Sequence, residues 1–296
     1  MIVVESLEDL RRARRSLAGA LGLVPTMGAL HEGHLSLIRR ARAECDAVAA
    51  SIFVNPAQFG PHEDLQRYPR QPERDLELLR SARTDLVWLP APEIVYPAAY
   101  QTYVSVEHLS QPLEGEARPG HFRGVATVVA KLFNTFQPQR AYFGQKDAQQ
   151  ATVIRRMSAD LDFPVEVVVC PTVREPDGLA MSSRNAYLPP EERQAAAVLY
   201  RALCAARAAF EQGERSGERL RAVMSGVIAG ESLARVEYVS AADPENLREL
   251  ETVRHAALLS TAVRIGETRL IDNLLLPGPP EPQPSWHRPL QSEPRS

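Results

Sequence analysis

A strand–loop–helix pattern within the first fifty residues constrains the fold more than any other part of the sequence. An apolar run over 21–24 ends at Pro25, and apolar residues then recur at helical spacing over 35–41. This pattern predicts a strand, a tight loop and an amphipathic helix that begins near Glu32. The almost continuous apolar run over 47–54 then predicts a buried second strand, joined to the first by a right-handed crossover.

Two histidines, His31 and His34, lie three residues apart where this helix is predicted to begin. Side chains at that spacing project to the same side of a helix. A helix N-terminus offers free N–H groups and a partial positive charge, both suited to phosphate. The two imidazoles can then donate hydrogen bonds to the α-phosphate of a nucleotide as charge develops there. The alternative is a pair of surface histidines that caps the helix.

Strands and helices continue to alternate up to about residue 188. This order predicts a Rossmann-like α/β domain with a doubly wound parallel sheet, whose ligands bind beyond the carboxyl ends of the strands. Segments 90–100 and 114–122 are rich in proline or glycine and are expected to be irregular. The predicted strands cover 2–4, 21–24, 47–54, 86–89, 102–106, 140–143 and 165–170, and the predicted helices cover 6–18, 32–41, 72–82, 125–136 and 149–161.

The composition changes after Leu188. Helices rich in Ala, Arg and Glu are predicted over 190–212 and 214–228, followed by antiparallel strands over 236–240, 256–265 and 268–275. These elements predict a second, smaller α+β domain over 189–276. The proline-rich segment 277–296 has little apolar content and is expected to be disordered.

Three loops at predicted strand ends carry polar side chains. The loop after the strand at 47–54 reads Asn-Pro-Ala-Gln-Phe-Gly, in which amides beside an aromatic ring can hydrogen-bond a small hydroxy acid; an ordinary turn is the alternative. Lys146 follows Gly144 at another strand end and is a flexible charge suited to phosphate. Met-Ser-Ser-Arg at 181–184 offers hydroxyls and an arginine that can bind phosphate through charge-assisted hydrogen bonds. The alternative is an ordinary surface sequence.

Composition and charge favour an ordinary globular protein. The net charge is −3 and the pI is about 6.2, so no overall basic footprint for nucleic acid or tRNA is present. Cys45, Cys170 and Cys204 form no CxxC pair and are expected to be reduced, buried thiols. No apolar run has the length of a membrane span or a signal peptide. We therefore expect a cytoplasmic protein without a membrane or nucleic-acid partner.

Residues 25–34, Pro-Thr-Met-Gly-Ala-Leu-His-Glu-Gly-His, resemble the nucleotide-binding signature of the pantoate:β-alanine ligases. This family is one branch of the HIGH-motif nucleotidyltransferases. The Asn-Pro-x-Gln-Phe, Gly-x-Lys-Asp and Met-Ser-Ser-Arg blocks downstream match the family in the same order, and the last resembles the superfamily's KMSKS-type loop. The resemblance extends from residue 1 to about residue 276.

The resemblance implies an ATP-dependent enzyme that joins pantoate to β-alanine through a pantoyl-adenylate and releases AMP and pyrophosphate. It also implies Mg²⁺ with ATP and a homodimer formed through the smaller domain; the metal ligands stay open. Two rival hypotheses remain. One is another HIGH-type nucleotidyltransferase that acts on a phosphorylated alcohol, and the other is a noncatalytic nucleotide- or RNA-binding module.

The resemblance also assigns roles to individual residues, with His31, His34 and Lys146 as the catalytic set and His34 as the proton donor. Gln58 is assigned to both pantoate and β-alanine. Gln145 stands where the family pattern has glutamate. The residues assigned to ATP are Met27, Gly28, Ala29, Leu30, His31, Glu32, Gly33, His34, Gly144, Gln145, Lys146, Asp147, Val173, Met181, Ser182, Ser183 and Arg184. Those assigned to pantoate are Pro25, Thr26, Asn55, Gln58, Tyr68, Arg118, His121 and Gln150.

Overall fold

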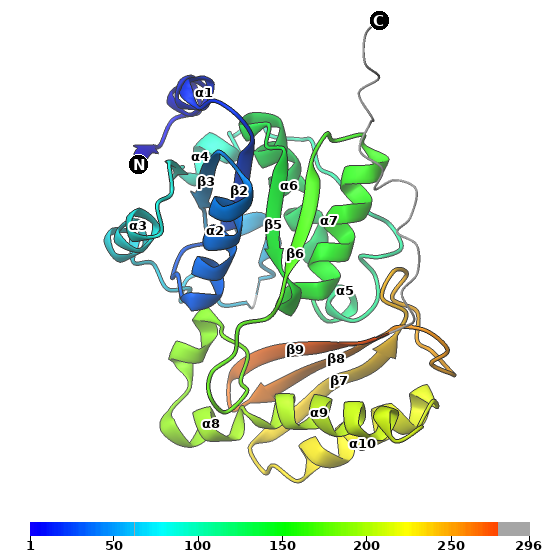
Figure 1. The fold of residues 1–296 in the computed structure, drawn as a ribbon. Helices are drawn as coiled ribbons and strands as arrows, with labels where there is room; N and C mark the ends of the chain where they lie inside the picture. The colour runs from blue at the N-terminus through cyan, green and yellow to red at the C-terminus, as the bar shows by residue number, and fades with distance from the viewer. Residues whose placement is uncertain (62, 278–296) are drawn as a thin grey trace, which may run out of the picture.

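The computed structural model describes residues 1–61 and 63–277, and a six-stranded parallel sheet organises its N-terminal part (Figure 1). The strand order is β1-β4-β3-β2-β5-β6, and every neighbouring pair is parallel. The predicted parallel α/β sheet is therefore confirmed. The strands are β1 (Ile2–Val4), β2 (Leu21–Thr26), β3 (Ala47–Ile52), β4 (Leu86–Trp88), β5 (Arg140–Gly144) and β6 (Glu166–Cys170).

Helices cover both faces of this sheet. One apolar cluster joins the sheet to α1, α6 and α7, and a second joins it to α2 and α3. The α-helices are α1 (Leu7–Ser16), α2 (Glu32–Glu44), α3 (Pro72–Ser81), α4 (Pro92–Val95), α5 (Glu114–Ala117), α6 (His121–Phe136) and α7 (Ala148–Asp160). Short 3-10 turns are η1 (Pro56–Gln58), η2 (Gln145–Asp147) and η3 (Ser183–Tyr187).

The order of the strands reverses at β2, which lies between β3 and β5. In doubly wound sheets, ligands bind at the carboxyl ends of the strands next to such a reversal. The loops that follow β2, β3, β5 and β6 all leave from this edge of the sheet. The fold therefore brings the segments with the predicted site residues to one place.

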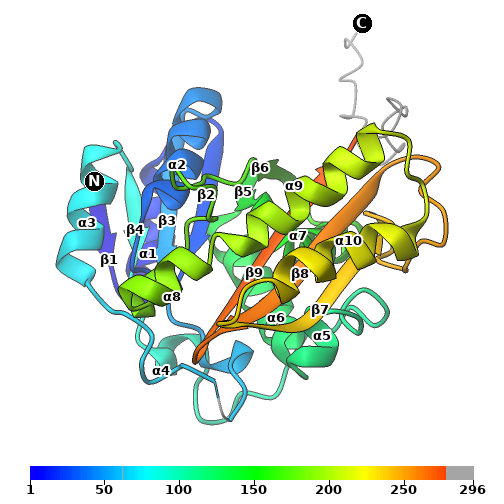
Figure 2. The ribbon, with the colours of Figure 1, turned by 90° about the horizontal axis from the view of Figure 1, so that it is seen from below.

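The C-terminal part is built on a three-stranded antiparallel sheet with its own apolar core. Helices α9 and α10 lie against one face of this sheet, as Figure 2 shows. The elements are α8 (Pro190–Ala195), α9 (Val198–Glu211), α10 (Gly217–Ala229), β7 (Ala234–Ala242), β8 (Ala257–Ile265) and β9 (Thr268–Leu276). We propose that the boundary between the two domains lies near residue 188. The predicted tail lies outside the described residues from position 278 onward.

The strand predicted over 21–24 was wrong in its end point. Pro25 does not end β2, which pairs with β3 through Thr26. On its other side β2 pairs with β5 at Gly22 and Leu23, so the missing N–H of Pro25 removes no bond from the described ladder.

The segments between β4 and α6 also differ from the predictions. Residues 101–106 form no strand among the described residues, and the N–H of Val104 donates to Thr127 Oγ1 at 3.0 Å instead. The segments expected to be irregular contain the short helices α4 and α5 and the first turn of α6. The single helix predicted over 190–212 is broken between α8 and α9. No helix in the described part of the chain is long and apolar enough to cross a membrane.

Candidate active site

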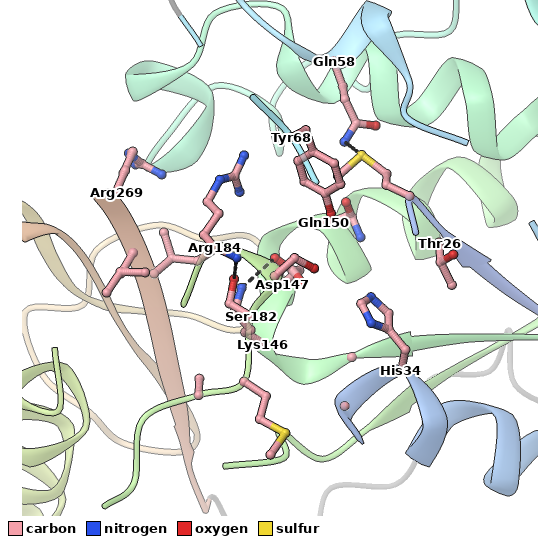
Figure 3. Close-up of a pocket in the computed structure, with 18 of the residues that line it drawn as sticks. Thr26, His34, Gln58, Tyr68, Lys146, Asp147, Gln150, Ser182, Arg184 and Arg269 are labelled. Atoms are coloured by element: carbon pink, nitrogen blue, oxygen red, sulfur yellow. Dashed lines mark hydrogen bonds and ion pairs between the residues drawn. The ribbon is translucent and has the colours of Figure 1, made fainter. Parts of the chain in front are cut away.

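A cavity of about 640 Å³ lies at the carboxyl edge of the parallel sheet, and the β8–β9 hairpin contributes part of its wall. Figure 3 shows Lys146, Asp147 and Arg184 grouped between His34 from α2 and Arg269 from β9. This size suits a nucleotide together with a small substrate. The predicted residues that line the cavity are Pro25, Thr26, Met27, His31, Gly33, His34, Asn55, Gln58, Tyr68, Arg118, His121, Gly144, Lys146, Asp147, Gln150, Val173, Met181, Ser182, Ser183 and Arg184.

Five residues assigned to ATP lie outside this lining, namely Gly28, Ala29, Leu30, Glu32 and Gln145. Glu32 is paired with Arg39 along the surface of α2. Gln145 Nε2 donates to Asn273 Oδ1 at 3.0 Å, so its side chain is directed toward β9. Their contact with ATP stays a prediction.

His31 and His34 cap the start of α2 through one nitrogen of each ring. His31 Nδ1 accepts the N–H of Gly33 at 3.1 Å, and His34 Nδ1 accepts the N–H of His31 at 3.4 Å. The ring centroids lie 4.1 Å apart. Because Nδ1 accepts in each ring, the proton of the neutral imidazole lies on Nε2. The pair therefore caps the helix and still offers two Nε2–H donors.

Both histidines are neutral at physiological pH. Burial, together with the charge of Lys146, lowers the pKa of His31 from 6.5 to about 4. Burial is also the largest cause for His34, and with His31 and Lys146 it lowers that pKa to about 3. The surroundings of the two rings thus disfavour further positive charge at this point.

Asp75 holds the loop that precedes the two histidines. Its buried carboxylate accepts the N–H groups of Ala29 and Leu30, both at 2.8 Å. Gly28 and Ala29 have φ values of 82° and 50°, a left-handed conformation that is unusual for alanine. A Cβ at Gly28 would lie 2.9 Å from Asp75 Oδ2. The amides of Ala29 and Leu30 therefore face α3.

The amide pair predicted for substrate lies in the loop after β3. Asn55 caps η1, and its Nδ2 donates to Gln58 Oε1 at 3.0 Å. Gln58 Nε2 in turn lies 3.2 Å from the thioether sulfur of Met27. Tyr96 holds the other end of Asn55 through a hydrogen bond of 2.8 Å to Oδ1. The loop is thus ordered around the amide side chains before any substrate enters.

Two consecutive acidic residues, Glu63 and Asp64, form ion pairs with arginines that line the cavity. Arg184 donates to both oxygens of Asp64, at 2.8 and 2.9 Å. Arg118 donates to both oxygens of Glu63, at 3.0 and 2.5 Å. His121 contacts Arg118 and the carbonyl of Gln58, and burial lowers its pKa to about 4. Each arginine must therefore release its carboxylate partner before the same N–H groups can bind an anionic ligand.

Sequence reasoning missed Glu63, Asp64 and Asp75. Glu63 and Asp64 follow the Asn-Pro-x-Gln-Phe block, but no local pattern indicates that they pair with arginines 55 and 120 residues away. The signal for Asp75 is equally weak, because an acidic residue in the first turn of a helix is usual. Within residues 1–61 and 63–277, no group of three or more His, Cys, Asp or Glu side chains is placed to hold a metal ion.

Comparison with known proteins finds one family along almost the entire chain. The family model described as pantoate-beta-alanine ligase matches residues 2–275. Pantothenate synthetase from Roseiflexus sp. is 63% identical over 276 residues, which cover 93% of this chain and 99% of the relative. The chain is also similar to pantothenate synthetase from Chloroflexus aggregans, at 62% identity over 277 residues that cover 93% of this chain and 100% of the relative.

Solved structures give the same result. The crystal structure of pantothenate synthetase from Thermus thermophilus has a TM-score of 0.89 at 51% identity and covers 93% of this chain and 99% of its own. The ligase from Francisella tularensis, described as complexed with beta-gamma ATP and beta-alanine, has a TM-score of 0.77 at 35% identity, with 93% and 97% covered. Sequence and fold together show that the chain belongs to the pantoate-beta-alanine ligase family.

Proposed function

We propose that this protein condenses pantoate with β-alanine at the expense of ATP and releases AMP and pyrophosphate. The observation that carries the proposal is the convergence on one cavity of the His31–His34 helix start, the Lys146 turn and the Met181–Arg184 segment. These groups supply donors and positive charge for a triphosphate. Gln58 and Gln150 line the same cavity and suit a small hydroxy acid.

In the first step, an oxygen of the pantoate carboxylate attacks the α-phosphorus of ATP. The bond from that phosphorus to the bridging oxygen breaks, and pyrophosphate leaves. The Nε2–H groups of His31 and His34 donate to the α-phosphate oxygens, and Lys146 follows the charge on the leaving group. No side chain acts as nucleophile, because positioning and charge neutralisation lower the barrier.

In the second step, the neutral amine of β-alanine attacks the acyl carbon of the adenylate. The bond from that carbon to the phosphate oxygen breaks, AMP leaves, and the amine nitrogen gives up its extra proton to solvent. We assign proton donation to His34 in the first step, where the negative charge of the bound triphosphate raises its pKa from the low value that burial gives it. Gln58 is proposed to contact both pantoate and β-alanine.

We also propose that ATP binds together with Mg²⁺, which contacts the triphosphate. Mg²⁺ usually keeps several waters and binds substrate phosphates with one or two carboxylates, so a dedicated protein cage is not required. Asp147 lines the cavity beside Lys146, with its Oδ1 3.6 Å from Lys146 Nζ, and is the carboxylate that we assign to this ion. Mg²⁺ would neutralise phosphate charge. The homodimer and the cytoplasmic location remain predictions as well.

Isotope exchange between pyrophosphate and ATP tests the proposal. Exchange should appear with the protein, Mg²⁺, ATP and pantoate, and β-alanine should not be needed. His34→Ala and Lys146→Ala should each reduce it by on the order of a hundredfold, the scale for loss of one donor to developing charge. A nucleotidyltransferase of phosphorylated alcohols would exchange only with its own substrate, and a binding module would not exchange. Exchange that strictly requires β-alanine would refute the adenylate mechanism.

A further inference from the structure

Asn273 on β9 makes three hydrogen bonds to the turn that carries Lys146. Its Nδ2 donates to the carbonyl oxygens of Gln145 at 2.9 Å and Lys146 at 2.8 Å. Its Oδ1 accepts from Gln145 Nε2 at 3.0 Å. Asn273 is buried and belongs to the C-terminal sheet, whereas η2 belongs to the N-terminal part. One side chain thus joins the two parts at the turn that carries Lys146.

The preceding residue, Asp272, fixes this strand against a second cavity segment. Its carboxylate accepts two hydrogen bonds from Arg174, at 2.6 and 3.0 Å, and also accepts the N–H of Asn273 at 2.8 Å. Arg174 follows Val173, which lines the cavity. Burial raises the pKa of Asp272, and the hydrogen bonds from Arg174 act in the opposite direction. The position of Asn273 is therefore set by a paired, buried neighbour.

The η2 turn depends on support from outside itself. It contains three residues, and among the described residues no side chain caps its start. The hydrogen bonds within a 3-10 turn have poorer geometry than those of an α-helix, so bonds from outside the turn add to the hold on its backbone. The two donors of Asn273 satisfy both carbonyls and fix the backbone from which the Lys146 side chain extends.

We propose that Asn273 is a positioning residue for Lys146, so that this side chain supports phosphate binding without itself contacting the nucleotide. Asn273 acts by holding the backbone of residues 145 and 146. The inference rests on the proposed function in one respect, namely that Lys146 binds the phosphates of ATP. A simpler structural role would be to stabilise the contact between the two parts of the chain, with no specific effect on Lys146.

Titration calorimetry with Mg-ATP alone separates these two roles. Asn273→Ala should weaken binding by about tenfold, the scale for loss of one or two buried hydrogen bonds. Asn273→Asp keeps the size of the side chain but cannot donate to the carbonyls, so we expect a similar loss. The matched control is Thr261→Ala, which removes a buried hydroxyl on β8 whose hydrogen bond among the described residues stays within the same sheet, to the carbonyl of Tyr238. It should leave ATP affinity unchanged.

A double-mutant cycle with Lys146→Ala gives the decisive readout. If Asn273 acts through Lys146, Asn273→Ala should cause little further loss of ATP affinity once Lys146→Ala is present. Equal losses in both backgrounds, or a lower melting temperature with unchanged ATP affinity, would overturn the proposal. If Asn273→Ala does not fold, Asn273→Ser carries the same cycle.

Steady-state kinetics should show different effects on the KM values of the two substrates. The KM for ATP should rise in Asn273→Ala while the KM for pantoate stays close to the wild-type value. The calorimetric cycle needs neither pantoate nor β-alanine. Failure of pantoate-dependent exchange would therefore refute the proposed function without deciding this inference. The inference is decided by the coupling between Asn273 and Lys146 in the double-mutant cycle.

Discussion

Arg184 donates two hydrogen bonds to the carboxylate of Asp64, at 2.8 and 2.9 Å, inside the cavity proposed for ATP. Burial alone would raise the pKa of Asp64, but the hydrogen bonds and charge of Arg184 outweigh it and lower that pKa. The pair is therefore ionised on both sides. Since Arg184 is also the arginine assigned to phosphate, Asp64 occupies the position that an anionic ligand would take on this guanidinium.

The first prediction concerns this competition. Asp64→Asn should strengthen Mg-ATP binding several-fold, because a neutral amide competes less well than a carboxylate for Arg184. Titration calorimetry measures the effect, and Glu63→Gln is the matched control, since Glu63 pairs with Arg118 instead. A loss of ATP affinity in Asp64→Asn, as large as that in Arg184→Ala, would show that Asp64 orients Arg184 for phosphate and does not compete with it.

The second prediction concerns the loop before the two histidines. Asp75→Asn should lower kcat by roughly tenfold or more, because an amide offers one acceptor and leaves one of the buried N–H groups of Ala29 and Leu30 unpaired. ATP affinity should change less, since those two amides face α3. Steady-state kinetics and calorimetry check both parts. Glu73→Gln, at an exposed position on the same helix, should behave as wild type; a normal kcat in Asp75→Asn would contradict the prediction.

The local patterns in the sequence predicted most of the parallel sheet. All six residues of β3 are buried, as its apolar run indicated. Ser6 and Asp9 stand three positions apart, as in a capping box, and Ser6 caps α1 by accepting the N–H of Asp9 at 3.1 Å. Residues 101–106 show the limit of such patterns. They alternate like a strand, yet strand formation also requires a neighbour, and the sequence does not show where neighbours lie.

The supporting residues of the site could not be predicted for a related reason. Asn273 reaches the Lys146 turn from 127 positions away in the chain, and Asp64 reaches Arg184 over 120 positions. Motifs identify the side chains that face a ligand, since these stand in short, recognisable blocks. The groups that hold those blocks in place come from tertiary contacts, which leave no regular spacing in the sequence.

The third prediction separates pantoate from ATP. Gln150→Ala should weaken pantoate binding by on the order of tenfold and leave ATP binding unchanged, because the substitution would leave a hydroxyl or carboxylate of pantoate without its partner. Gln58→Ala should do the same. Gln149→Ala is a matched contrast, since Gln149 bonds to the carbonyls of Leu109 and Pro112 and should affect stability instead. Calorimetry with each ligand alone checks this, and an equal loss of ATP affinity would contradict the assignment.

The fourth prediction follows from the low pKa values of His31 and His34, about 4 and about 3. In the unfolded chain both histidines bind protons below about pH 6.5, whereas in the folded protein they stay neutral to much lower pH. The unfolded state therefore binds more protons in this window. The free energy of unfolding should be highest above about pH 6.5 and should fall as the pH decreases toward about 4.

Denaturant unfolding between about pH 5 and pH 7 measures this effect together with that of His121, whose pKa is also lowered to about 4, because carboxylates with lowered pKa values contribute mainly at lower pH. His34→Gln removes one titrating group, so its free energy of unfolding should depend less steeply on pH than that of the wild type. Gln58→Ala, a change to an uncharged side chain of the same cavity, should keep the wild-type slope. If His34→Gln also keeps that slope, burial does not hold His34 neutral in the folded protein, and its assignment as a neutral Nε2–H donor fails.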